Sequence, residues 1–192
     1  MESITKHIVI FASGSGSNAL NLIQYFNKGT KAKVVAVFSN KKEAGVVQKA
    51  IDNQVDVFCF DRNDFYHSDH VIRKVEEYRP DIIVLAGFLW LVPLSFIKAF
   101  EGKIINLHPS LLPKYGGKGM YGHHVHNAVL EAGEKETGIT IHMVDEAYDR
   151  GDVICQKSFD ILPEDNLNSI ETKIHMLEHQ FLPLTVELFL DK

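Results

Sequence analysis

Uninterrupted hydrophobic runs recur along the first half of the chain. They span His7–Ala12, Lys33–Phe38, Val55–Phe60 and Asp81–Ala86. Strands that are apolar on both faces are typical of a parallel sheet covered on both sides. Between the runs, residues 19–26, 43–53 and 64–78 carry apolar residues at helical spacing. This alternation predicts an α/β fold: a doubly wound, mostly parallel sheet with helices on both faces, as in Rossmann-like proteins.

The pattern changes after residue 100. Residues 137–144 alternate branched and polar side chains as a strand does, and 153–159 form another strand after a carboxylate-rich loop. Helices are predicted from His123 to about Ala132 and over residues 167–190, the latter interrupted near Pro183 because proline lacks the N–H that a helix needs.

The turn after the first strand reads SGSGSN and leads into a helical segment. Gly14 and Gly16 permit positive φ angles and close approach of the backbone to a ligand. The N–H groups of Ser17, Asn18 and Ala19 then lie at the helix start, where the helix dipole favours an anion. The turn therefore predicts a phosphate-binding site.

Gly14, Gly16 and Ala19 also satisfy the loose dinucleotide fingerprint G-x-G-x-x-G/A. That fingerprint requires an acidic residue at the end of the next strand. The strand over residues 33–38 ends instead in Ser-Asn-Lys-Lys, so a phosphate monoester is favoured over NAD. An NAD(P)-dependent oxidoreductase and a merely structural turn remain alternatives.

The stretch IINLHPSLLPKYGG, residues 104–117, places Asn106 and His108 two residues apart at the end of an apolar run, and Pro109 prevents a helix there. In a strand, residues i and i+2 point to the same side. Asn106 and His108 should therefore face a common space. Ligands of such sheets sit beyond the carboxyl ends of the strands, where this stretch, the SGSGSN turn and the segment 87–92 converge.

Composition and net charge indicate the broad class of the protein. The 192 residues are 45% hydrophobic and 23% charged with a net charge of −5, which predicts one soluble domain over residues 1–192 and disfavours nucleic-acid binding. The first apolar run is too short for an export signal or a membrane span. Cys59 and Cys155 lie in apolar runs and are interpreted as buried structural thiols of a cytoplasmic protein.

A glycine-rich segment, residues 114–122, is predicted to be a mobile loop beside the site. His123, His124 and His126 follow it. No cysteine or carboxylate lies at ligand spacing from them, so solvated histidines at a helix start are favoured over a metal site, and no metal is expected.

Taken together, these segments resemble the 10-formyltetrahydrofolate-dependent formyltransferases over nearly the whole chain. The resemblance is carried by SGSGSN, by LAGF at 85–88, by INLHPSLLPKY at 105–115, by TGITIH at 137–142 and by DEAYDRGDVI at 145–154. It is greatest to the members that act on glycinamide ribonucleotide. The resemblance implies that formyl passes from 10-formyltetrahydrofolate, a co-substrate, to the amine of glycinamide ribonucleotide in purine synthesis, by a monomer or homodimer.

The resemblance also assigns roles to residues. It implies a catalytic trio in which Asn106 and a protonated His108 stabilise the oxyanion while Asp149 assists proton transfer. The implied substrate-binding residues are Gly16, Ser17, Asn18, Gly87, Leu89, Pro109 and Glu178. The implied folate-binding residues are Arg62, Leu89, Trp90, Leu91, Val92, Asn106, Val144, Asp145, Glu146, Ala147 and Tyr148.

Three features depart from the family pattern. Trp90 stands where arginine is common, His175 stands where lysine or glutamine is usual, and the loop over residues 115–126 is longer. Methionyl-tRNA formyltransferase, a sugar formyltransferase, and formyltetrahydrofolate hydrolase are the nearest alternatives. The first is disfavoured by the negative charge and by the expected absence of a tRNA-binding domain, and the hydrolase by the phosphate-binding turn. A non-enzymatic phosphate-binding module would leave Asn106, His108 and Asp149 unexplained.

Overall fold

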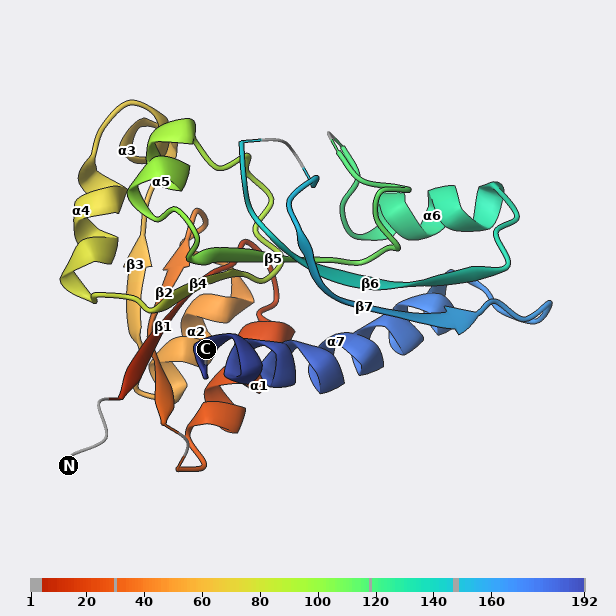
Figure 1. Ribbon diagram of the computed structural model, residues 1–192, viewed down its shortest axis with the longest axis horizontal. Coiled ribbons are helices and arrows are strands. Elements are labelled where there is room, and N and C mark those ends of the chain that lie inside the picture. The colour runs from red at the N-terminus through yellow and green to blue at the C-terminus, as the bar shows by residue number, and fades with distance from the viewer. Residues whose placement is uncertain (1–4, 30, 118, 147–148, 192) are drawn as a thin grey trace.

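The computed structural model describes residues 5–29, 31–117, 119–146 and 149–191 (Figure 1). Seven strands form one sheet in the order β3-β2-β1-β4-β5-β6-β7. Neighbours from β3 to β5 pair in parallel, whereas β6 and β7 are antiparallel additions. The strands are β1 Lys6–Phe11, β2 Ala32–Ser39, β3 Asp56–Cys59, β4 Ile82–Leu85, β5 Ile104–His108, β6 Glu136–Met143 and β7 Val153–Asp160. The predicted mostly parallel α/β fold is confirmed.

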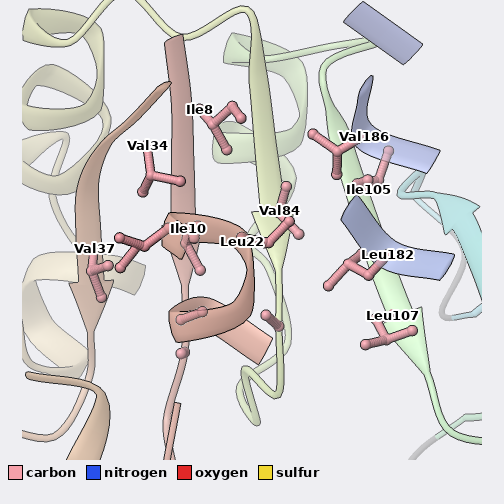
Figure 2. Packing of buried hydrophobic residues seen from close by; sticks show 14 of the residues in the cluster. Ile8, Ile10, Leu22, Val34, Val37, Val84, Ile105, Leu107, Leu182 and Val186 are labelled. Atoms are coloured by element: carbon pink, nitrogen blue, oxygen red, sulfur yellow. The ribbon is translucent and has the colours of Figure 1, made fainter. Parts of the chain in front are cut away.

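Helices cover both faces of the sheet. They are α1 Ser17–Phe26, α2 Gly45–Asp52, α3 Arg62–Tyr66, α4 His70–Glu77, α5 Leu94–Ala99, α6 His123–Glu131 and α7 Leu167–Leu190. Ile8 and Ile10 of β1 pack with α1, α2 and α7, while Val9 and Phe11 pack with α3, α4 and α5. Figure 2 shows Leu182 of α7 reaching the first of these faces. This two-sided burial is why residues 8–11 of β1 and all of β4 are apolar.

The strand order reverses between β1 and β4, because the chain crosses from β1 outward to β2 and β3 and then returns to β4. A crevice forms at such a switch point, beyond the carboxyl ends of the strands. The loops after β1 and β4 are tied together there: Ser13 N–H donates to the Gly87 carbonyl at 3.0 Å, and Leu89 N–H donates to the Ser13 hydroxyl at 3.0 Å.

The helix expected over residues 64–78 is two helices, α3 and α4. Asp61 and Asp64 form a capping box that starts α3, because each side chain accepts the other's backbone N–H. The Ser68 hydroxyl accepts the His70 N–H at 3.2 Å and starts α4 afresh. Polar side chains that bond the backbone locally divide the segment, although its apolar spacing is continuous.

The interruption expected near Pro183 is also wrong, since α7 runs through it. Pro183 has no N–H for the carbonyl of His179, four residues earlier. The Asn21 side-chain amide of α1 donates to that carbonyl at 2.7 Å instead. A tertiary hydrogen bond thus replaces the helical one.

Cys59 and Cys155 are unpaired thiols that are partly exposed, so the expectation that they are buried is also wrong. Burial still raises the pKa of the Cys59 thiol. Among the helices of the described residues, none has the length and hydrophobicity needed to cross a membrane.

Candidate active site

A cavity of about 320 Å³ lies beyond the carboxyl ends of β1, β4 and β5. Its walls come from the turn after β1, the loop after β4, the end of β5, and the facing parts of α6 and α7. The three loops predicted to converge therefore do so. Of the residues expected at a substrate site, it is lined by Gly16, Ser17, Asn18, Gly87, Leu89, Asn106, His108, Pro109, Asp149 and Glu178.

Gly16 makes the turn at one end of this cavity possible. Its φ is +76°, and a Cβ built there would lie 2.6 Å from both Cα and Cβ of Val46 in α2. Only glycine fits such a position without a shift of the backbone. The first N–H groups of α1 are consequently held at the cavity wall, where they have no helical partner.

Asn18 joins this turn to α7. Its Nδ2 donates to Oε2 of Glu178 at 2.9 Å, and Glu178 is buried. The Asn18 Oδ1 is also buried and has no hydrogen-bond partner in the described part of the chain. Two residues 160 positions apart thus present polar atoms to one cavity wall.

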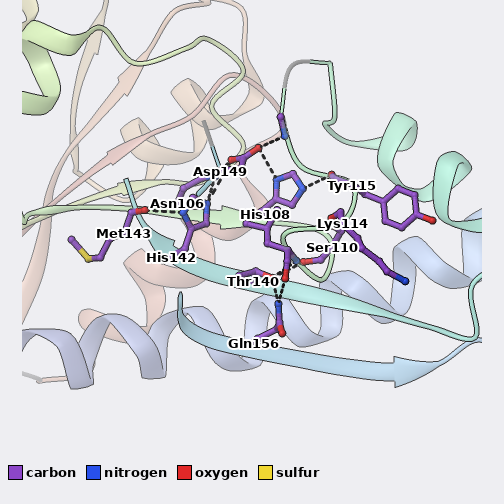
Figure 3. A network of polar contacts seen from close by, with 12 residues as sticks. Asn106, His108, Ser110, Lys114, Tyr115, Thr140, His142, Met143, Asp149 and Gln156 are labelled. Carbon is purple, nitrogen blue, oxygen red and sulfur yellow. Dashed lines mark hydrogen bonds and ion pairs between the residues drawn. The ribbon is translucent and has the colours of Figure 1, made fainter. Parts of the chain in front are cut away.

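Asn106, His108 and Asp149 meet at the opposite end (Figure 3). Asp149 Oδ1 accepts from Asn106 Nδ2 at 3.4 Å, and Asp149 Oδ2 lies 3.7 Å from His108 Nδ1. The Gly117 N–H donates to the same Oδ2 at 2.8 Å. Two residues after Asp149, a Cβ at Gly151 would lie only 1.9 Å from the Met143 carbonyl oxygen of β6, so glycine allows the chain to pass this close to the strand.

Burial lowers the pKa of His108, and the nearby Asp149 carboxylate and the Tyr115 carbonyl offset only part of this effect. This direction favours the neutral imidazole in the substrate-free protein. Its Nε2 lies 2.8 Å from the Tyr115 carbonyl oxygen, which can only accept, so the proton is on Nε2 and the lone pair on Nδ1.

Asp149 stays ionised. Burial by itself would raise its pKa, but His142, the Gly117 N–H and His108 together outweigh burial and hold the pKa below its ordinary value. A buried carboxylate beside a neutral imidazole can stabilise positive charge that forms on that imidazole.

His142 is a site residue that the sequence analysis did not single out. It pairs with Asn106 across the β5–β6 ladder and is 2% exposed. Its Nδ1 donates to the Met143 carbonyl at 2.8 Å, so Nε2 can accept from Asn106 Nδ2, 3.2 Å away. His142 was visible as a polar residue in an apolar strand, but its place beside Asn106 depends on the strand register.

A second cavity, of about 280 Å³, adjoins the first. Phe88, Asn106 and Asp149 line both. Its other walls are mainly apolar, and among the expected folate-binding residues it is lined by Trp90, Leu91, Val92, Val144, Asp145 and Glu146. Leu89 faces the first cavity instead. Ala147 and Tyr148 lie outside the described residues.

Arg62 lies beside this second cavity. Its guanidinium carbon is 5.0 Å from the centre of the Trp90 ring, a distance at which a cation is attracted to an aromatic face. Tyr66 donates its hydroxyl to the Leu91 carbonyl at 2.8 Å and holds the same loop. The residues over 88–91 thus contribute to the walls of the two cavities.

The histidines at the start of α6 do not all face solvent. His126 is 4% exposed, and burial lowers its pKa, so the expectation of solvated side chains is wrong for it. His123 contacts Glu171, and His175 bonds Glu178 at 2.9 Å, which raises the pKa of His175. In the described ranges, no group of three His, Cys, Asp or Glu side chains is arranged to hold a metal ion.

The chain is similar to known proteins over most of its length. The family model described as "Formyl transferase" matches residues 6–186. The chain is 36% identical over 187 residues to the chloroplastic phosphoribosylglycinamide formyltransferase of Vigna unguiculata, covering 95% of this chain and 60% of that protein. It is 34% identical to the Escherichia coli phosphoribosylglycinamide formyltransferase, covering 96% and 87%.

A solved structure of phosphoribosylglycinamide formyltransferase from Bacillus halodurans superposes with a TM-score of 0.88 at 37% identity, covering 97% of this chain and 96% of that one. The chain thus spans about three fifths of the plant relative's length and nearly all of this bacterial structure.

Proposed function

The chain belongs to the formyl transferase family, and from that premise we propose that it transfers the formyl group of 10-formyltetrahydrofolate to the amine of glycinamide ribonucleotide. The observation that carries the proposal is the pair of adjoining cavities. They share Asn106 and Asp149, so two different small molecules would meet at these residues. A transfer reaction between two substrates needs such a junction.

The two cavities suit the two substrates. The first ends at the start of α1, where N–H groups favour the phosphate of the ribonucleotide. Its Glu178 carboxylate suits hydroxyl or amine groups of the same molecule. The second has apolar walls with peptide groups at its edge, which suits the planar pterin ring of the folate.

The proposed reaction begins with attack of the acceptor amine on the formyl carbon. The tetrahedral intermediate carries an oxyanion. We propose that the Asn106 side-chain N–H, which in the substrate-free protein makes a long 3.4 Å bond to Asp149, donates to that oxyanion. His108 Nδ1 takes the proton from the amine, and Asp149 stabilises the resulting imidazolium. The intermediate then collapses: the bond from the formyl carbon to the folate nitrogen breaks, and that nitrogen takes the proton back from His108 Nδ1.

A steady-state absorbance assay tests this function. It would follow deformylation of 10-formyl-dideazafolate with and without glycinamide ribonucleotide, against a control without enzyme. We expect release only when the ribonucleotide is present. Release without it would establish a hydrolase, whereas no release with an active co-substrate would overturn the proposal and return the oxidoreductase or phosphate-binding module to consideration.

We further propose that the protein acts in the cytoplasm as a monomer or homodimer on small molecules alone. Its negative net charge supports the absence of a nucleic-acid partner. Light scattering on the purified protein would measure the oligomeric state, and a species larger than a dimer would contradict this part of the proposal.

A further inference from the structure

The Tyr115 carbonyl, in the peptide between Tyr115 and Gly116, fixes the tautomer of His108, and an outer side chain holds Tyr115 in place. We propose that Glu134, on the loop between α6 and β6, is a positioning residue that acts on His108 through Tyr115. It contacts no catalytic atom itself. The part of this inference that concerns turnover rests on the function proposed above.

The backbone of Tyr115 is in an unfavourable conformation. Its φ is +55°, a left-handed value that places Cβ close to the following carbonyl in any residue other than glycine. Such a conformation persists when surrounding bonds determine it, and it is found most often at functional sites. Without those bonds the residue would relax and its carbonyl would turn.

Two sets of bonds hold Tyr115. On the outside, its hydroxyl donates to Glu134 Oε1 at 2.9 Å, while Lys114 Nζ contacts both Glu134 oxygens at 2.9 and 3.1 Å. On the inside, Ser110 donates its hydroxyl to the Lys114 carbonyl at 2.9 Å (Figure 3). Glu134 thus secures the aromatic side chain, and Ser110 secures the preceding peptide.

The consequence for the site follows from the Tyr115 carbonyl. It accepts the Nε2 proton of His108, which leaves Nδ1 as the basic nitrogen 3.7 Å from Asp149. If the carbonyl turns away, Nε2 loses its acceptor inside a buried site. The other neutral tautomer, with its proton on Nδ1 toward Asp149, would then be favoured, and it cannot accept the amine proton at that nitrogen.

The direct test is ¹⁵N nuclear magnetic resonance of histidine-labelled protein, in which His108 is assigned by its loss in His108→Asn. We expect the Nε2–H tautomer in the native protein and in Glu134→Gln, which keeps an oxygen acceptor for the tyrosine. In Glu134→Ala and Tyr115→Phe we expect a substantial fraction of Nδ1–H. An unchanged tautomer in both variants would overturn the proposal, whether or not the formyl transfer assay succeeds.

Turnover gives the second readout. For Glu134→Ala and Tyr115→Phe we expect kcat to fall about tenfold with KM for both substrates nearly unchanged, as for partial loss of a general base. Glu134→Gln should restore most of kcat. A rise in KM without a fall in kcat would indicate a role in binding and contradict the inference.

The chain offers a matched control. Tyr25 donates its hydroxyl to Glu187 Oε2 at 2.6 Å, which joins α1 to α7 without touching the 114–117 loop. Tyr25→Phe and Glu187→Ala remove the same kind of bond. They should lower thermal stability by amounts similar to the Tyr115 and Glu134 variants and leave the His108 tautomer and kcat as in the native protein. If the control variants also change the tautomer, a general loss of stability explains the effect and the inference fails.

Discussion

The two cavities are adjacent but are built by different means. The wall of the first includes the backbone N–H groups at the start of α1 and the hydrogen-bonded side chains of Asn18 and Glu178, and its turn depends on Gly16. The second is made of apolar side chains around Trp90 and Val144. In the proposed function, the phosphate is recognised by backbone geometry at the start of α1, whereas the planar ring is recognised by side-chain surface.

The two cavities meet at Asn106 and Asp149, which line both of them. Asn106 is partly buried, the Asp149 side chain is almost enclosed, and both lie beside the buried His142. The comparison predicts that substitutions in one cavity affect one substrate, whereas substitutions at the junction affect the reaction itself.

The largest effect is expected at the junction. His108→Ala removes the proposed base, and Asp149→Asn removes the charge that stabilises its protonated form. Each should reduce kcat by at least roughly a hundredfold. Circular dichroism should show an intact fold in both. A rate near that of the native protein in either variant would remove that residue from the mechanism.

In the first cavity, Asn18→Ala should raise KM for the phosphorylated acceptor roughly tenfold, because it deletes a bond to the charged Glu178 and alters the first turn of α1. KM for the folate should be unchanged. Steady-state kinetics with each substrate varied in turn would measure both values, and equal changes in the two would contradict the division between the cavities.

In the second cavity, Trp90→Ala should raise KM for the folate about three- to tenfold, since an aromatic wall is lost. Trp90→Phe keeps an aromatic ring and is the matched control, with a smaller rise. The acceptor KM should stay as in the native protein. If Trp90→Ala changes only the acceptor KM, the folate is assigned to the wrong cavity.

The pKa of His108 can be tested by titration. Because burial lowers the pKa of His108, the midpoint of its titration in the substrate-free protein should lie below its ordinary value of about 6.5. The base is neutral above that midpoint, so activity should fall as the pH falls through it. In Asp149→Asn an attractive charge is lost, and the midpoint should move lower still. Nuclear magnetic resonance of the His108 ring would measure the titration midpoint in both proteins. A higher midpoint in Asp149→Asn than in the native protein would contradict this prediction.

The smallest effect is expected at Asn21, which lies one helical turn from Asn18 and also bonds α7. Asn21→Ala should lower the free energy of unfolding by about 1 kcal/mol or less, because the His179 carbonyl lies near solvent. Both KM values should be unchanged. Pro183→Ala restores the helical N–H, so in that background the Asn21 substitution should cost less; urea unfolding of all four proteins tests this coupling.

Several features were determined by the sequence itself, because they depend on local periodicity. Apolar positions on both faces predicted the parallel strands β1 to β4, and the glycines of SGSGSN predicted a turn that a ligand can approach. The spacing of Asn106 and His108 placed both side chains on one side of β5, where they line the same cavity. The pleat of a strand places side chains two residues apart on the same face, whatever the rest of the chain does.

Other features were decided only by the tertiary structure, because they depend on groups distant in the chain. Asn21 lets α7 continue through Pro183, and the register between β5 and β6 places His142 beside Asn106. Burial lowers the pKa of His108 and encloses His126. Desolvation and strand register depend on the packing of the whole chain, so a local sequence pattern does not predict them.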